Sequence, residues 1–515
     1  MRSTFLFFIF SLFVVTLLGQ ISPIYENLPV GKYAVGFKII TLTDSSRITK
    51  PEYNYLGEKN AGDRFRKITI HLWYPAKTNQ RKKAIAYSDY CYNHLLSSTN
   101  ENLSDEQKNA QLTGRRRSVE NWFGKTTDEA WKRLTETEML AQKEEDPIKE
   151  KFPLLIGMLR PLSTSVTNEM LASNGYIVAM IQQGNFSSFA LSTLEAIPDM
   201  RLAIAYLEKN TGIDNDKIGT FGFSGSGFSQ VLFAMNEYRV KAVADIESGI
   251  YMDGLFQNFS ASNYYMPSKL RVPFLHIFSR DLSKQEKFID EFEKKTKFTK
   301  RYRLLLNQPA LHHWDFAAEG YTSCIFLNNR GTEQANIKRS FEIASIYLLN
   351  FFNAELKKDD AAQVFLSTKP LLIQTSPNLW DISIYNSVRP TPDEDEFEYI
   401  IRTKGINECL AIVHNTLKDD SSSNIVEGNV LNNLGYTFLN EKKHQEAIGV
   451  FKLNTEIHPE NANFFDSLAE GYEVSGDKEN MKKVSGIVVG LLNKKAVLTD
   501  AEKSLKEIAE RRIKN

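Results

Sequence analysis

The sequence predicts an α/β domain built on a mostly parallel sheet with helices on both faces, followed by an all-α domain of helical repeats. Two observations lead to this prediction. Short apolar runs alternate with helical stretches between residues 153 and 306, which is the pattern of strand–helix–strand units. Beyond residues 376–394, which are rich in Pro, Asn and acidic side chains, the rest of the chain reads as helix.

The composition excludes some classes of function. The chain has 515 residues, enough for two or three domains, and its 42% apolar and 24% charged residues are ordinary for a globular protein. Lys plus Arg and Asp plus Glu both number 63, so the net charge is zero and the chain lacks the basic surface of a nucleic-acid binder. Small molecules or other proteins are the expected partners.

The N-terminus has the layout of a secretory signal peptide. Arg2 precedes an apolar run over residues 5–18, and the small Gly19 follows it. That run is shorter than the roughly 20 residues of a membrane-spanning helix, although an uncleaved anchor is the alternative interpretation. We therefore expect residues 1–19 to be removed and the mature protein to be periplasmic or secreted, with no transmembrane span.

The three cysteines, Cys91, Cys324 and Cys409, are odd in number and widely spaced. This spacing predicts neither a disulfide framework nor a metal cluster. One bridge from Cys91 to Cys324 is conceivable in an oxidising compartment. Three buried thiols that form no disulfide are the favoured interpretation.

The α/β domain is expected over residues 20–375. Alternating polar and apolar residues predict strands at 33–43 and 67–74. Residues 92–150 are charged and helical, and we interpret them as an inserted helical segment, a candidate lid. The alternating strands and helices then follow, with strands predicted at 153–157, 176–181, 217–222, 240–246, 272–278 and 302–306, and helices at 168–175, 199–207 and 227–236.

Residues 222–227 read GFSGSG and lie between a predicted strand and a predicted helix. A serine in such a sharp turn is exposed above the sheet edge, and its neighbours two residues away must be small. Ser224 is therefore the predicted nucleophile. Ser226 is the rival nucleophile, and a Gly/Ser turn without chemistry is the remaining alternative.

A serine nucleophile needs a base and an acid that orients the base. His312 and His313 follow the last predicted strand, where the histidine belongs in the chain order nucleophile, acid, histidine. Glu247 ends the strand at 240–246 and Asp281 follows the strand at 272–278, so either residue could be the acid. Their positions in the sequence do not decide which of the two orients the histidine.

The oxyanion of the reaction needs two backbone N–H donors. Gly225, next to the nucleophile, is one predicted donor. The other is expected in the loop after residues 153–157. Since Pro161 has no N–H, the second donor is Arg160 or Leu162. Neither a metal nor a cofactor is required by this chemistry.

With these residues in view, residues 30–350 resemble the dienelactone hydrolase-like branch of the α/β-hydrolases, in particular the platelet-activating-factor acetylhydrolase-like enzymes. The resemblance is carried by the segments 70–76 (IHLWYPA), 152–155 (FPLL), 171–178 (LASNGYIV), 222–224 (GFS), 239–247 (RVKAVADIE) and 313–316 (HWDF). It implies an α/β-hydrolase fold. It also implies that Glu247 is the acid, in place of the family's Asp, and that His313 is the base, because Asp315 and Phe316 follow it.

The C-terminal domain, expected over residues 395–515 after a linker at 376–394, resembles tetratricopeptide repeats. Leu431, Leu434, Gly435, Phe438, Ala447, Phe451 and Pro459 fall at the spacing of that repeat of about 34 residues, and a second copy follows. An irregular helical bundle is the alternative. The resemblance implies a surface for a protein or peptide partner.

The predicted function is that of an exported serine hydrolase that cleaves small-molecule carboxylic esters, lipid or acetyl esters among them, through an acyl-enzyme. Two alternatives remain open at this stage. One is a catalytically decayed hydrolase fold that acts as a scaffold through its helical repeats. The other is a serine peptidase, because the same triad cleaves amides.

Overall fold

A computed structural model describes residues 22–60, 64–77, 84–93, 103–158, 161–182, 189–248, 250, 254–283, 286–368, 379–386, 394–419 and 428–514. The chain forms two compact units, which divide between Ser387 and Val388. The predicted signal peptide lies outside the described residues. None of the described helices is long and apolar enough to cross a membrane.

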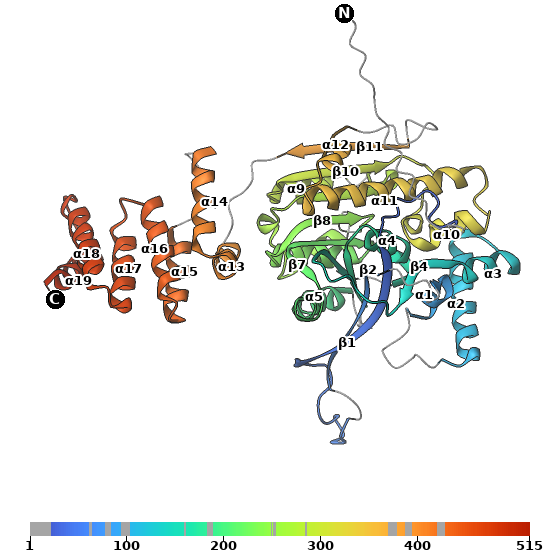
Figure 1. Cartoon of the computed structure of the whole chain (residues 1–515), viewed down its shortest axis with the longest axis horizontal. Coiled ribbons are helices and arrows are strands. Elements are labelled where there is room, and N and C mark those ends of the chain that lie inside the picture. Colours follow the sequence, from blue (N-terminus) through green and yellow to red (C-terminus); the bar gives the residue numbers. More distant parts are fainter. Residues whose placement is uncertain are drawn as a thin grey trace, which may run out of the picture. The chain divides into compact units, whose positions relative to one another are not determined.

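The first unit is organised around one sheet, whose strand order is β11-β10-β9-β8-β7-β5-β6-β2-β1-β4-β3 (Figure 1). The strands are β1 (Ala34–Ile48), β2 (Phe65–Ala76), β3 (Ala84–Ala86), β4 (Glu138–Lys143), β5 (Phe152–Met158), β6 (Ile177–Ile181), β7 (Ile213–Phe223), β8 (Val240–Ile246), β9 (Phe274–Ser279), β10 (Lys300–Leu306) and β11 (Trp380–Asn386).

The centre of the sheet, from β6 across to β10, is parallel. In the register of these strands Phe223 lies beside Ile246, which in turn lies beside Ile277. The residues that follow β7 and β8 therefore leave the sheet at the same edge. The chain also changes direction here, because β6 and β7 lie on opposite sides of β5, and such a switch point opens a crevice at the carboxyl ends of the strands.

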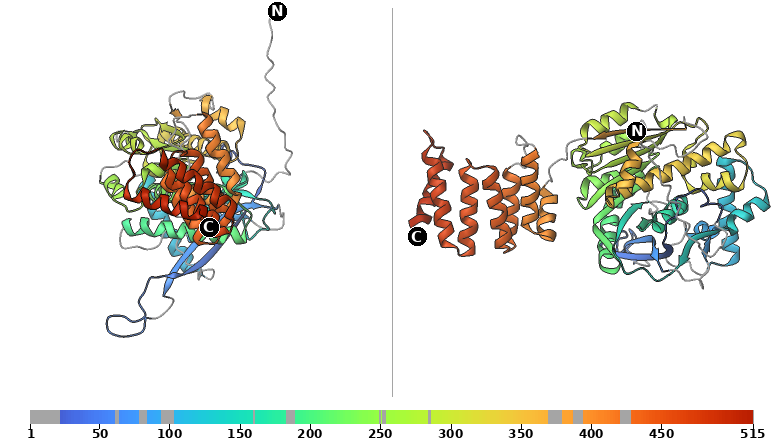
Figure 2. Two further views of the ribbon diagram at one scale, coloured as in Figure 1. Left: turned by 90° about the vertical axis from the view of Figure 1, so that its left-hand side faces the viewer. Right: turned by 45° about the horizontal axis from the view of Figure 1, so that its top comes forward.

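Helices cover both faces of the sheet (Figure 2), as predicted. Strands β5 and β6 are continuous apolar runs because both of their faces are buried: every residue of the two strands is buried. One face carries α4 (Pro161–Ser173), α10 (Ala318–Phe326) and α11 (Gln334–Leu356), and the other carries α5 (Phe189–Asn210), α6 (Ser226–Asn236) and α9 (Glu286–Lys295). The remaining short helices of this unit are α1 (Tyr87–Asn93), α7 (Leu255–Ser260), η2 (Pro267–Lys269), α8 (Arg280–Ser283), η3 (His313–Phe316), η4 (Gly331–Glu333) and α12 (Asp360–Thr368).

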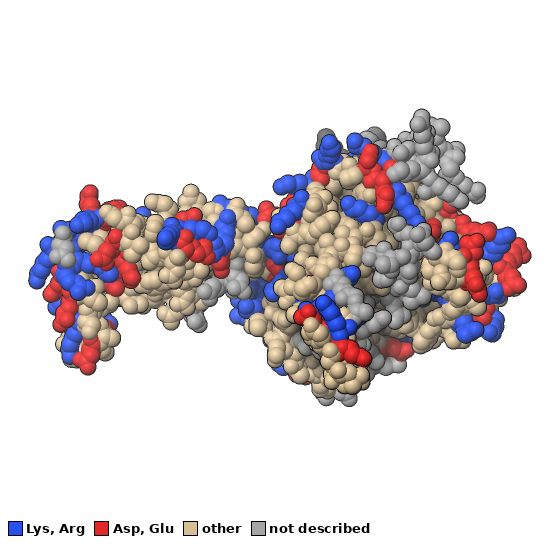
Figure 3. All heavy atoms as spheres, turned by 90° about the horizontal axis from the view of Figure 1, so that it is seen from below, with Lys and Arg blue, Asp and Glu red and all other residues tan. Residues whose placement is uncertain are grey.

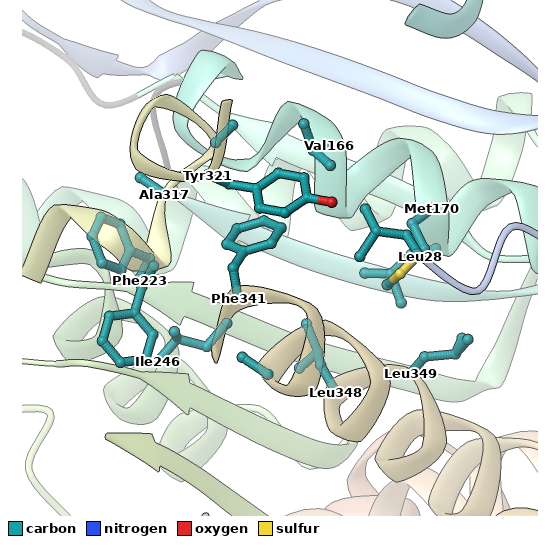
Figure 4. Close-up of a cluster of buried hydrophobic side chains, with 14 of the residues drawn as sticks. Leu28, Val166, Met170, Phe223, Ile246, Ala317, Tyr321, Phe341, Leu348 and Leu349 are labelled. Carbon is teal, nitrogen blue, oxygen red and sulfur yellow. The ribbon is translucent and has the colours of Figure 1, made fainter. Parts of the chain in front are cut away.

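The core on the α4 and α11 face reaches the sheet edge where the candidate site lies. The rings of Tyr321 and Phe341 stack at 4.3 Å between centroids (Figure 4). The same buried cluster includes Phe223 and Ile246, the last residues of β7 and β8. Burial of each such side chain stabilises the fold by about 1.5–3 kcal/mol, so the turns that leave these strands start from a rigid base.

The inserted segment at 92–150 is only partly helical, which corrects the sequence prediction. It contains α2 (Asp105–Phe123) and α3 (Asp128–Glu136), and α2 begins with a capping box between Ser104 and Gln107. It also contains β4, which pairs in parallel with β1 and antiparallel with β3. The segment is therefore part of the sheet as well as a cover beside it.

The expected linker at 376–394 is also wrong in part, because β11 occupies its centre. This strand pairs antiparallel with β10, Trp380 opposite Leu306. Trp380 is buried, and its indole N–H donates to the hydroxyl of Tyr347 at 3.1 Å. The division between the two units therefore falls after β11.

The second unit is all helical. Its helices are α13 (Glu394–Lys404), α14 (Ile406–Asp419), α15 (Gly428–Asn440), α16 (His444–Ile457), α17 (Ala462–Ser475), α18 (Lys478–Asn493) and α19 (Asp500–Lys514). From α15 to α19 each helix packs on the next. Helix α17 begins at Ala462, 34 residues after Gly428, where α15 begins. A Cβ at Gly435 would lie 2.3 Å from the ring of Phe451, so this close helix crossing needs glycine. The assignment of these helices to tetratricopeptide repeats stays a prediction.

The three cysteines are buried and form no disulfide in the described structure, as the favoured interpretation expected. On the face drawn in Figure 3, Lys and Arg lie among Asp and Glu rather than in one basic surface.

Candidate active site

Ser224 lies in a tight turn between β7 and α6. Its φ is +59°, in the left-handed region that non-glycine residues rarely adopt. The Ser224 N–H donates to the Ile246 carbonyl at 3.0 Å, and the Gly227 N–H donates to the Ser224 carbonyl at 3.0 Å. The turn is thus fixed to the neighbouring strand β8, and Ser224 stands at the carboxyl edge of the sheet.

Ser226, the rival nucleophile, is built into the same turn. Its hydroxyl donates to the Phe223 carbonyl at 2.6 Å and accepts from the Phe223 N–H at 3.1 Å, and the residue is buried. The position that requires glycine is the next one, since a Cβ at Gly227 would lie 2.4 Å from both Asp245 Oδ1 and Ser248 Oγ. This arrangement explains how Ser226 occupies the last position of the turn, which is glycine in the usual G-x-S-x-G pattern.

His313 is brought directly to Ser224. Its Nε2 lies 2.7 Å from Ser224 Oγ. The imidazole stacks on the ring of Phe223 at 4.9 Å between centroids, which holds the ring in place. Burial lowers the pKa of His313 from its usual value of 6.5, so the ring is neutral near neutral pH and can accept a proton. His312 is exposed, and its backbone N–H donates to Asp315.

A buried ion pair holds the turn that carries His313. The two carboxylate oxygens of Asp315 accept from the guanidinium of Arg330 at 2.6 and 2.9 Å. Asp315 is 1% exposed, so this bidentate pair is desolvated. Sequence reasoning missed Arg330, because nothing in its own segment reveals a contact with residue 315.

The two candidate acids follow neighbouring strands at the same edge. The carboxylate of Glu247 accepts from the N–H of Ser279 at 2.6 Å and from its hydroxyl at 2.7 Å. Between the described residues Glu247 and His313 there is no hydrogen bond. Burial, together with the nearby negative charge of Asp281, raises the pKa of Glu247 to about 7, although the two hydrogen bonds from Ser279 lower it. Asp281 is exposed in the first turn of α8. The structure therefore brings Ser224 and His313 together, and it joins Glu247 to Ser279, which sequence reasoning also missed.

Two of the predicted oxyanion donors lie at helix N-termini. Gly225 is the N-cap of α6, and Leu162 is the second residue of α4. The first N–H groups of a helix have no partner within it and carry partial positive charge. Since α4 follows β5 and α6 follows the adjacent strand β7, both N-termini lie at the same sheet edge. Arg160, the other predicted donor, lies outside the described residues.

Asp245 and His276 lie side by side in β8 and β9, next to the turn that carries Ser224. The two groups are fully buried, with 3.6 Å between Oδ2 and Nε2. Burial raises the pKa of Asp245 well above its usual range and lowers the pKa of His276 well below its own, so both side chains are neutral. The described residues contain no group of three or more His, Cys, Asp or Glu placed to hold a metal ion.

Comparison with known proteins gives likenesses among solved structures only. No family model and no curated protein matches the chain. Among solved structures, a ferulic acid esterase from Streptomyces cinnamoneus is similar, with a TM-score of 0.45 and 18% sequence identity, over 70% of this chain and 98% of that chain.

Proposed function

We propose that the chain is an exported serine hydrolase that cleaves carboxylic esters through an acyl-enzyme. The observation that carries this proposal is the 2.7 Å contact between Ser224 Oγ and His313 Nε2, made at a strand–helix turn. A neutral imidazole at that distance can take the hydroxyl proton as the oxygen becomes a nucleophile.

In the first half of the reaction Ser224 Oγ bonds to the carbonyl carbon while its proton moves to His313 Nε2. The carbonyl electron pair moves onto oxygen, where the N–H groups of Gly225 and Leu162 stabilise the charge. The intermediate collapses, the bond to the leaving oxygen breaks, and His313 returns its proton to that oxygen. An alcohol leaves and Ser224 remains acylated.

In the second half a water molecule attacks the acyl carbon and gives its proton to His313. Collapse breaks the bond to Ser224 Oγ, which regains its proton, and a carboxylic acid is released. We assign the role of orienting acid to Glu247, with Asp281 as the alternative. For this role the carboxylate of Glu247 exchanges one of its contacts with Ser279 for the imidazole N–H.

Two further parts of the proposal rest on the sequence. The apolar N-terminal run supports export, and the spacing of the helical unit supports a peptide or protein partner there. Neither part is needed for the chemistry at Ser224.

A fluorophosphonate probe tests the proposal, because it labels activated serines. We expect the wild-type chain to be labelled and to hydrolyse simple esters over a range of acyl-chain lengths. Ser224→Ala should abolish labelling and lower turnover by about 10⁴ or more. Labelling that persists in Ser224→Ala would disprove the assignment of the nucleophile. A folded wild-type chain that neither reacts with the probe nor hydrolyses any ester would favour the non-catalytic scaffold.

A further inference from the structure

Strands β1 and β2 continue beyond the sheet as a two-stranded arm. Ile70 of β2 lies opposite Ile181, the last residue of β6, and Ile40 of β1 lies opposite Ile70. The described residues between 41 and 69 therefore extend past the carboxyl ends of the parallel strands. Figures 1 and 2 show this arm standing out from the first unit. The arm leaves the sheet at the edge where Ser224 lies.

A buried acid fixes the base of the arm. Asp199, from α5, is fully buried, and its carboxylate accepts from Arg47 of β1 at 2.6 Å and from Arg66 of β2 at 2.5 Å. Arg47 also donates to Glu195 of the same helix at 2.6 Å. Both strands are thus tied to α5 by charge-assisted hydrogen bonds, which are stronger than neutral ones. The direction of the arm is therefore set by the body of the first unit.

The far end of the arm presents apolar side chains on a closed turn. Tyr53, Tyr55 and Leu56, which form the tip, are 55%, 97% and 68% exposed. The side-chain oxygen of Asn54 accepts from the N–H of Leu56 at 2.9 Å and from the N–H of Glu58 at 3.0 Å, so the turn is held by its own hydrogen bonds. Single exposed apolar residues are ordinary, but three of them within four positions at a protruding end indicate a contact surface.

We propose that the tip docks on a zwitterionic lipid surface, into which Tyr55 and Leu56 insert. Tyrosine suits a membrane interface because its ring is apolar and its hydroxyl is polar, and leucine adds apolar area to the inserted part. Residues 48–65 contain three basic and three acidic residues, so the arm has no net charge to attract an anionic surface. Two of these residues, Glu52 and Arg64, pair with each other at 3.1 Å. The inference does not depend on ester hydrolysis at Ser224.

A second copy of the chain fits the tip less well than a lipid surface does. A stable dimer buries about 800 Å² on each partner. The tip offers on the order of 400 Å², given that a fully buried aromatic side chain contributes about 150–250 Å². A lipid surface needs no matching pocket, because its molecules rearrange around a side chain that inserts.

Sedimentation with large unilamellar vesicles of phosphatidylcholine tests the proposal. The chain from residue 20 onward is used, because the apolar run at 5–18 would bind lipid by itself. We expect equal binding at about 50 mM and about 500 mM salt, and no increase when phosphatidylglycerol is added, because charge does not drive the association. Absence of binding to phosphatidylcholine would overturn the proposal. Binding that needs phosphatidylglycerol and disappears at high salt would overturn it as well.

Variants locate the contact. The double substitution Tyr55→Ser and Leu56→Ser should lower the partition coefficient by about 10-fold or more, because it removes most of the apolar area that inserts. The matched control is Trp122→Ser with Val364→Ser, which removes an aromatic and an aliphatic side chain, each 60% exposed, elsewhere in the same unit. This control should bind as the wild type does. Circular dichroism checks that both variants are folded, and equal losses of binding in the two would contradict the proposal.

Two measurements on the same samples separate the other outcomes. In size-exclusion chromatography without lipid we expect a monomer, whereas a dimer that becomes monomeric on substitution of Tyr55 and Leu56 would show that the tip binds a second copy. Fluorophosphonate labelling of Ser224 reports the proposed function independently. Labelling without vesicle binding removes the lipid contact and leaves the hydrolase. Vesicle binding without labelling supports the lipid contact and removes the hydrolase.

Discussion

At the scale of single residues, the role of orienting acid that we propose for Glu247 requires the same carboxylate that already accepts from Ser279. The residue holds Ser279 through two hydrogen bonds, and it ends the strand beside the nucleophile strand. An orienting acid must be ionised to accept the imidazole N–H, yet burial favours the neutral carboxyl here. Activity should therefore depend on pH through this residue.

We expect kcat/KM to fall as the pH drops through about 7, the pKa of Glu247, because protonation removes the acceptor for the imidazole N–H. The pKa of His313 is lowered, so loss of the base through its protonation begins at a pH below 6.5. Glu247→Gln should remove the limb near pH 7 and lower turnover by up to about 10⁴.

Asp281→Asn is the matched comparison. It removes a negative charge that raises the pKa of Glu247, so the limb should move to lower pH with little loss of maximal rate. A larger loss of turnover in Asp281→Asn than in Glu247→Gln would show that Asp281 is the acid.

Ser226→Ala separates turn structure from catalysis. The substitution deletes two buried hydrogen bonds to the Phe223 backbone, which should lower the free energy of unfolding by about 1–3 kcal/mol while ester hydrolysis persists. Denaturant titration and an ester assay on the same sample measure both effects. Ser367→Ala, which removes one exposed hydrogen bond to Val364, is the control and should change neither. Loss of fluorophosphonate labelling in folded Ser226→Ala would contradict this account.

At the scale of elements, the short helix η3 positions the histidine and is itself held by α10 and Arg330. Arg330→Met leaves the Asp315 carboxylate buried without its partner. Breaking a buried pair in this way costs about 3–5 kcal/mol, and kcat should fall because His313 loses its fixed position.

The control for this variant is Arg402→Met, which breaks an exposed pair with Glu441 in the second unit. Such surface pairs contribute about 1 kcal/mol or less. Thermal unfolding and ester kinetics measure both variants. Equal effects of the two substitutions would mean that the Asp315 pair does not hold the site.

How far the sequence predicts these elements depends on what fixes each one. Strand β8 is mostly apolar, with Lys241 and Asp245 as its two charged residues, and its predicted bounds at 240–246 agree with the structure. Strand β4 reads as helix because Met139, Leu140 and Ala141 are good helix formers, and only pairing with β1 and β3 makes it extended. Strand β11 was obscured by the Pro-rich segments that flank it.

Within the site, too, residues that follow a local sequence pattern were predicted, and residues that act through contacts between distant segments were not. Ser224 and His313 could be found because their chemistry leaves a local pattern, a small-residue turn and a histidine after the last strand of the predicted series. Ser279 and Arg330 act through contacts between segments 15 to 32 residues apart, which no local pattern records. The hydrogen bonds from Ser279 to Glu247 form only when the sheet brings the ends of β8 and β9 together.

At the scale of the whole molecule, the boundary after β11 makes a direct prediction for truncation. A chain that ends at Ser387 keeps the complete sheet, so it should be soluble and hydrolyse small esters at the full-length rate. A chain that ends at residue 375 lacks β11 and exposes the edge of β10, which should make it less stable and prone to aggregate. Size-exclusion chromatography and ester kinetics distinguish the two. Loss of activity in the longer chain would mean that the helical unit supports the site.

Each unit contains at least one buried cysteine, whose alkylation can report the opening of that unit. Cys91 and Cys324 belong to the first unit and Cys409 to the second, and all three are at most 3% exposed. Burial raises the pKa of Cys91 and of Cys324 to about 12, so both are held as thiols, whereas alkylating reagents react with thiolates. Alkylation must wait for the surrounding structure to open. Peptide mapping of a timed alkylation would therefore give a separate rate of opening for each unit in the same sample. Cys91 and Cys324 report on the sheet, and Cys409 reports on the helices.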